Sequence, residues 1–190
     1  MKQYPVNLKI EYSEKSNKST ALFRLVLIIP IVIILAIISS CAEALSLAVG
    51  LLILFREKYP KWWFDWNVGI TKFTYRIVAY GLLMRDEYPS TDDDQAVKVD
   101  IPYPDVKKDL NRWMPLFKWI LVIPHIIVLI LIFIAVVFCT VFAWFAILLT
   151  GRYPKGIFDF VEGFLRWSLR VNAYVFLLTT DEYPPFRLRE

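Results

Sequence analysis

Two ionisable side chains inside long apolar stretches are the residues of this sequence best suited to chemistry. His125 is the only histidine among the 190 residues, and Glu43 is the only acidic residue inside either stretch. Ionisable groups at membrane depth commonly mark proton relays or ion pathways. His125 is therefore a candidate proton relay, haem ligand or metal ligand, and Glu43 is a candidate for ion coupling.

Both residues also have a structural interpretation, which we favour. His125 would be a neutral imidazole near the membrane surface, bonded to a backbone carbonyl, and Glu43 would be solvated at a polar turn. A lone histidine makes a poor metal site, and Cys41 and Cys139 lack the spacing of a zinc site or a disulfide framework. Nucleophile–base pairs and phosphate-binding loops are also missing. We predict a non-enzymatic protein without cofactor or metal.

The elements that must position these residues occur twice along the chain. Three motifs recur 94 or 95 residues apart: Tyr-Pro-Lys at 59 and 153, Phe-Asp at 64 and 158, and Asp-Glu-Tyr-Pro at 86 and 181. Proline ends a helix, and tyrosine favours the membrane–water boundary, so Tyr-Pro pairs mark where elements end. The sequence predicts a tandem duplication with repeat units 1–90 and 91–190.

The composition is that of a membrane protein. Hydrophobic residues make up 57% of the chain and aromatic residues 16%, whereas about 45–50% apolar residues is usual in soluble domains. The net charge is +4, but the basic residues lie mainly outside the apolar stretches, as in cytoplasmic flanks. No basic helix or known module accompanies the charge, which argues against nucleic acid as a partner.

The apolar stretches 23–55 and 114–150 are too long for one straight crossing. A helix of 33 residues is about 50 Å long, against a hydrocarbon core of about 30 Å. Basic residues flank both stretches in the same way, which favours an even number of crossings per unit. We therefore expect a short helical hairpin in each unit, with an apex at 39–43 in the first. The chain would be multi-pass in the cell inner (cytoplasmic) membrane, with its termini and linker cytoplasmic.

Each unit begins with an extended arm and ends with an amphipathic helix. Residues 6–12 and 97–103 alternate apolar and polar side chains, as strands do. Segments 62–84 and 157–178 are expected to be helices with one charged stripe each. The stripe residues, which could contact lipid or a partner, are Asp65, Lys72, Arg76, Asp159, Glu162, Arg166 and Arg170. We favour helices that lie at the interface with the stripe towards water; return crossings that pair the stripes inside a bundle are the alternative.

Five motifs of the second unit together resemble a known family. They are Ile-Pro-His at 123, Gly-Arg-Tyr-Pro at 151, Phe-Asp-Phe at 158, Arg-Trp at 166 and Asp-Glu-Tyr-Pro-Pro-Phe at 181. They are similar to the bacterial membrane proteins grouped as domain of unknown function 4389. The first unit is a degraded copy, with Ile31 in place of the histidine and Ser90 in place of the second proline. The resemblance implies an integral membrane protein and brings no activity.

These observations predict an all-α integral membrane protein, each unit with an extended arm, an apolar hairpin and an interfacial helix. We expect an accessory or scaffolding subunit, or a bilayer-shaping element that resembles reticulon-type proteins in architecture alone. Its partners would be membrane lipid and other membrane-protein subunits or further copies of itself. The alternative is a small oligomeric channel or transporter that uses Glu43, His125 and the charged stripes. An enzyme acting on lipid or quinone ranks third.

Overall fold

The computed structural model describes residues 4–189, apart from the side chains of residues 41–43. Glu43 is one of these three, so the predicted polar site at its carboxylate lies outside the described residues. The elements, in chain order, are β1 (Asn7–Ile10), α1 (Lys18–Leu27), α2 (Ile29–Arg56), α3 (Lys61–Gly81), β2 (Val97–Asp100), α4 (Val106–Asp109), α5 (Met114–Leu121), α6 (Ile123–Thr150) and α7 (Lys155–Val175).

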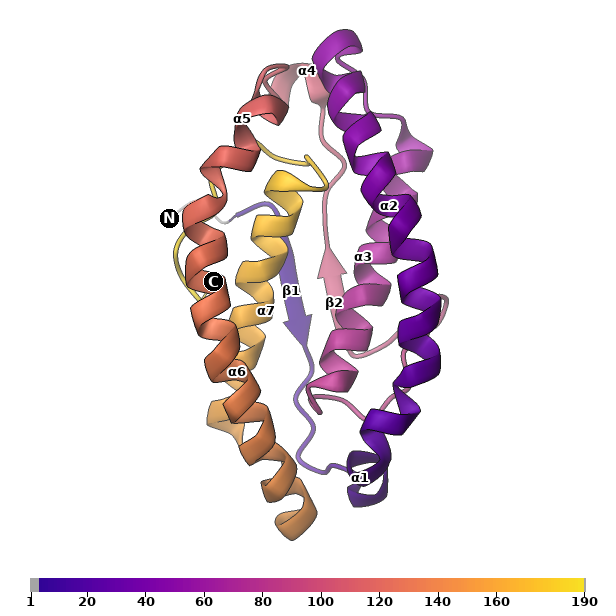
Figure 1. Cartoon of the computed structure of the whole chain (residues 1–190), viewed down its shortest axis with the longest axis vertical. Helices are drawn as coiled ribbons and strands as arrows, with labels where there is room; N and C mark the ends of the chain where they lie inside the picture. Colours follow the sequence, from indigo (N-terminus) through magenta and orange to yellow (C-terminus); the bar gives the residue numbers. More distant parts are fainter. Residues whose placement is uncertain (1–3, 190) are drawn as a thin grey trace.

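The two units are arranged around a pseudo-twofold axis that passes through a small sheet. β1 and β2 pair antiparallel, with Leu8 opposite Val99. These two residues are 91 positions apart, as are all equivalent residues of the two arms, so the axis passes through this pair. Figure 1 shows α2 and α6 at opposite sides of the molecule, running in opposite directions, with the strands farther from the viewer.

The units exchange their arms. β1 of the first unit packs on α7 of the second, and β2 of the second unit packs on α3 of the first. The short helices that precede α2 and α6 are exchanged in the same way, because α1 of the first unit packs on α6 and α5 of the second unit packs on α2. The extended arms predicted from sequence are confirmed, but they form a shared sheet, so the fold is not purely helical.

Each apolar stretch forms a kinked helix, and the predicted hairpin is wrong. The first stretch breaks only at Ile28, between α1 and α2, and the second only at Val122, between α5 and α6. Pro30 and Pro124 follow these breaks, and proline lacks the N–H that would continue the hydrogen-bond ladder. At the supposed apex, the Ser40 hydroxyl donates to the carbonyl of Ile37 within α2, so a polar group here does not require a turn.

The amphipathic helices lie close to their predicted positions. α3 and α7 begin directly after Pro60 and Pro154, as the Tyr-Pro motif indicates. Both end three residues before the predicted boundary, where the chain turns at Leu83 and Leu178 with φ of 63° and 54°. A leucine in this left-handed region costs about 1–2 kcal/mol. Both units have this left-handed leucine at the equivalent position.

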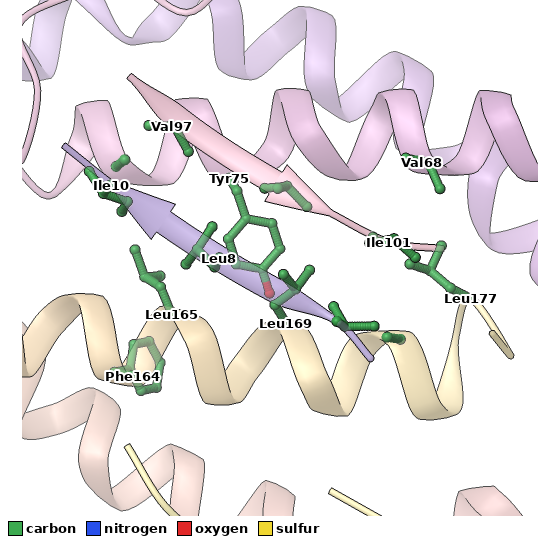
Figure 2. Close-up of a cluster of buried hydrophobic side chains, with 14 of the residues drawn as sticks. Leu8, Ile10, Val68, Tyr75, Val97, Ile101, Phe164, Leu165, Leu169 and Leu177 are labelled. Atoms are coloured by element: carbon green, nitrogen blue, oxygen red, sulfur yellow. The ribbon is translucent and has the colours of Figure 1, made fainter. Parts of the chain in front are cut away.

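The core lies between one face of the sheet and the two amphipathic helices. Leu8 and Ile10 point from β1 towards Leu165 and Leu169 of α7, and Val97 of β2 lies beside α3 (Figure 2). The side chain of Leu8, on the pseudo-twofold axis, is fully buried. The other face of the sheet is exposed and charged, and its residues are Lys9, Glu11, Lys98 and Asp100.

Buried tyrosines predict a late phenolic titration. Burial raises the pKa of Tyr59 to about 12, and it also raises the pKa values of Tyr4, Tyr75 and Tyr153. Their unfolded pKa is about 10, so these groups contribute stability below pH 10 that is lost as the pH rises through about 12. We expect part of the phenolate absorbance to be absent at pH 11 and to appear when denaturant is added. Titration of all tyrosines near pH 10 in the native protein would contradict this burial.

Candidate functional site

The Asp-Glu-Tyr-Pro motif of the second unit builds a buried ion pair. The Lys118 Nζ of α5 lies 2.7 Å from Asp181 Oδ1 and donates to the carbonyl of Thr180 at 2.7 Å. The ammonium also lies 4.8 Å from the ring centroid of Tyr174, within cation–π range. The Lys118 side chain is 1% exposed. Burial lowers the pKa of Lys118, and the Asp181 carboxylate opposes that shift.

The first unit contains the equivalent cluster with arginine in place of lysine. Arg24 Nη2 of α1 lies 2.5 Å from Asp86 Oδ1, and Arg24 Nη1 donates to the carbonyl of Arg85 at 3.0 Å. Its guanidinium lies 3.9 Å from the ring centroid of Tyr80. Every member aligns with its counterpart at an offset of 94 or 95 residues. The ion pair therefore belongs to the repeated unit and ties the loop after the amphipathic helix to the start of the apolar helix.

From the sequence alone, Arg24 and Lys118 are only basic flanks of the apolar stretches. Their acidic partners stand about 60 residues later, beyond the range of local patterns, so spacing along a helix could not reveal them. The only sequence signal for the ion pair is the repeat. A base in the apolar helix start and an acid in Asp-Glu-Tyr-Pro are both present in each copy, although the rest of the first copy is degraded.

His125 is fully buried in an aromatic cluster of the second unit. Its Nδ1 accepts a hydrogen bond from Trp167 Nε1 at 3.1 Å, and its ring stacks on Phe186 with centroids 3.9 Å apart. An Nδ1 that accepts this bond carries no proton, so the neutral ring has its N–H at Nε2. Within the described part of the chain, Nε2 has no hydrogen-bond partner. The predicted hydrogen-bond partner of His125 was a backbone carbonyl, whereas the structure has the indole N–H of Trp167.

The first unit fills the same place with apolar side chains. Ile31 stands where His125 stands, and Phe73 stands where Trp167 stands. Together with Ile77 they form a small buried cluster. The histidine–indole bond is therefore a feature of the second unit alone, and a shared chemical function of both units cannot depend on it.

The charged stripe of α7 is used inside the molecule. Glu162 Oε1 accepts from the backbone N–H of Ile10 at 2.8 Å, and Arg166 Nε donates to the carbonyl of Leu8 at 3.1 Å. These backbone groups belong to the edge of β1 that faces away from β2. An open strand edge needs such partners, and the stripe supplies them.

Arg170 continues this stripe and holds the C-terminal segment. Its guanidinium donates to the carbonyls of Arg187 and Arg189 at 3.2 Å each. Gly163, two turns earlier on α7, lets the segment approach closely, because a Cβ there would lie 2.9 Å from Leu188 Cβ. The structure thus places Arg166 and Arg170 in internal contacts, away from water.

The remaining stripe residues lie nearer the surface. Asp65 and Asp159 are exposed, and each pairs with the lysine one turn earlier in its helix. Lys72 is also exposed, while Arg76 is half-buried and donates to the carbonyl of Ser90 at 2.5 Å. The seven predicted residues are therefore not brought together into one site.

Three of the hollows in the described part of the chain lie between helices. Two are apolar grooves of about 370 and 270 Å³, one between α1 and α6 and the other between α5 and α2, and they are mates under the repeat. The third, of about 230 Å³, has hydroxyl and amide groups from α2, α3 and α7; its polar residues are Ser39, Ser46, Asn67, Thr71, Thr74 and Asn172. Among the described residues, no group of three or more His, Cys, Asp or Glu is placed to hold a metal ion.

The apolar helices define the class of protein. α2 and α6 have 28 residues each, and the mean hydropathies of their most apolar parts are 2.3 and 3.4. Both are long and apolar enough to cross a membrane, and few of their residues are buried inside the molecule. The fold is thus a mostly helical tandem repeat with one such helix in each unit.

Comparison with known families agrees with this division. The family model described as "Domain of unknown function (DUF4389)" matches residues 18–91 and 112–187. The chain belongs to this family and contains two tandem copies of its domain, which confirms the resemblance seen in the motifs. No curated protein and no solved structure matches the chain.

Proposed function

We propose that this chain is a membrane protein that acts through contacts with lipid and partner subunits and catalyses no reaction. The observation that carries the proposal is the apolar surface of α2 and α6. Ile37, Phe55, Phe142 and Leu149 are 67, 72, 70 and 79% exposed. Contiguous apolar patches of more than a few hundred Å² mark interaction surfaces, and these two helices together present such a surface along their length.

The buried charges support a scaffolding role. Lys118 and Arg24 hold loops to helices, and Arg166 and Arg170 hold a strand and the C-terminal segment. Groups engaged in this way are poorly placed to bind a substrate or to move protons. The proposed protein is an accessory subunit or bilayer-shaping element of the cell inner (cytoplasmic) membrane.

The alternative, a small channel or transporter, has one observation in its favour. The pocket lined by hydroxyl and amide groups lies against α2, one of the two apolar helices. His125 and the charged residues of α7 do not line it. A polar pocket beside an apolar helix is a possible solute site, but this one has no described connection to the other candidate residues.

Reconstitution of the purified protein into liposomes tests the proposal. We expect the protein to float with the vesicles at high salt, because apolar burial does not depend on ionic strength as charge attraction does. If it shapes the bilayer, it will tubulate the liposomes or sort to those of higher curvature. Solute or ion flux that Glu43→Gln abolishes would support the channel instead, and turnover of a lipid would overturn the non-enzymatic reading.

A further inference from the structure

We infer that the protein lies in one leaflet with its pseudo-twofold axis along the membrane normal, so that α2 and α6 run in the membrane plane and do not cross it. This inference rests on the proposed membrane association and specifies the surface used. The partner is the lipid surface itself. It would be contacted by the layer made of α1, α2, α5 and α6, while the charged face of the sheet points to water.

The exposed charges of the sheet lie at mid-length of the molecule. The sheet is centred on the Leu8–Val99 pair, which lies on the pseudo-twofold axis and therefore halfway along the molecule. Lys9, Glu11, Lys98 and Asp100 project from its outer face. If α2 and α6 crossed the bilayer, these side chains would be exposed near its centre. A charged side chain at the bilayer centre is strongly unfavourable, and open sheets do not face lipid.

The C-terminal segment gives the same result. It follows the middle of α7, where Arg166 and Arg170 hold the backbone of residues 187–189. The exposed Arg189 would therefore also lie at mid-depth in a spanning arrangement. In the flat arrangement, no exposed charge of the sheet or of this segment has to lie at the bilayer centre.

The exposed apolar side chains gather on one layer of helices. Most of the large ones belong to α1, α2, α5 and α6, and six of the most exposed there are Leu25, Ile37, Phe55, Ile120, Phe142 and Leu149. The charged sheet packs on α3 and α7, and α2 and α6 pack on the same two helices. Figure 1 shows α2 and α6 nearer the viewer than the strands. One broad face is thus apolar and the opposite face is polar.

Basic residues lie at both ends of the molecule. At one end Arg112 donates to the carbonyl of Leu54, and at the other Lys18 donates to the carbonyl of Leu149. The basic flanks of both units therefore meet at each end, and spanning would place them on both sides of the membrane. The positive-inside rule disfavours that. A flat molecule places both ends at one anionic headgroup layer, which attracts basic side chains.

Site-directed labelling tests this orientation. Four single-cysteine variants are made after Cys41 and Cys139 are replaced by alanine: Lys58→Cys and Arg152→Cys at the two ends, Lys98→Cys on the sheet, and Phe142→Cys on α6. A membrane-impermeant maleimide is applied to sealed right-side-out and inverted vesicles from the expressing cells. All four substituted side chains are exposed, so the fold should tolerate the changes.

For the flat arrangement we expect positions 58, 98 and 152 to be labelled from the same side of the membrane. Position 142, which would be buried in lipid, should not be labelled from either side. Labelling of 58 and 152 from opposite sides, with 98 protected, would overturn the inference and leave the membrane proposal intact. Labelling of all four positions in protein that does not sediment with the vesicles would instead overturn the proposed membrane function. Lys9→Cys is a second sheet variant in case Lys98→Cys disturbs the fold.

Discussion

Replacing Asp181 by alanine is expected to lower the free energy of unfolding by about 3–5 kcal/mol, because it leaves the Lys118 ammonium buried without its carboxylate. The Thr180 carbonyl would remain as a hydrogen-bond partner but carries no compensating charge. Unfolding in mixed detergent micelles, followed by tryptophan fluorescence, would measure the change. The equivalent substitution Asp86→Ala should act in the same direction on Arg24.

Asp159 provides a matched control within the same unit. Lys155–Asp159 and Lys118–Asp181 have the same N–O separation of 2.7 Å, but the lysine side chains are 56% and 1% exposed. Asp159→Ala should therefore cost less than about 1 kcal/mol. The double variant Lys118→Met/Asp181→Asn should regain much of the loss, because no unpaired charge stays buried. Equal losses for the two single aspartate variants would refute the assigned role of burial.

Replacing His125 by isoleucine is expected to cost about 2–4 kcal/mol, because the buried Trp167 N–H loses its acceptor and the ring loses its stacking on Phe186. The first unit shows how the same space is filled without a histidine, with Ile31 beside Phe73. The double variant His125→Ile/Trp167→Phe reproduces that arrangement and should recover at least half of the lost stability. Thermal unfolding of the three proteins in the same detergent would measure this.

The same pair of variants separates a structural histidine from a functional one. If His125 has a structural role, the double variant should behave like the parent protein on liposomes. Loss of a membrane activity in the double variant, with stability restored, would show that the imidazole does more than accept the indole hydrogen bond.

How far the sequence predicts this structure depends on the distance over which each interaction acts. The amphipathic helices were predicted to within a few residues, because Pro60 and Pro154 mark their starts locally. The arms were predicted as strands from their alternation, but their mutual pairing could not be, because Leu8 and Val99 are brought together only by the fold. The hairpin prediction is wrong because each stretch breaks near its start, at Ile28 and Val122, and continues as one helix of 28 residues through the expected apex.

The candidate site was predicted less well than the fold. The sequence places the stripe residues on one face of each helix and predicts that this face points to water, which holds for the exposed Asp65, Lys72 and Asp159 but not for the buried Arg166 and Arg170. Arg166 instead bonds the carbonyl of Leu8, 158 residues earlier in the chain. Helical periodicity states which residues share a face and contains no information about what covers that face.

The exchanged arms have a consequence for the smallest assembly that can fold. Because β1 lies on α7 and β2 on α3, a solitary unit would present a bare amphipathic helix and an unpaired strand. Two copies of one unit could satisfy each other by the same exchange. The tandem chain therefore has the architecture of a domain-swapped dimer whose two subunits are covalently linked, and a one-domain relative would need to form an obligate homodimer. The linkage also lets the two halves diverge, as the histidine confined to one half illustrates.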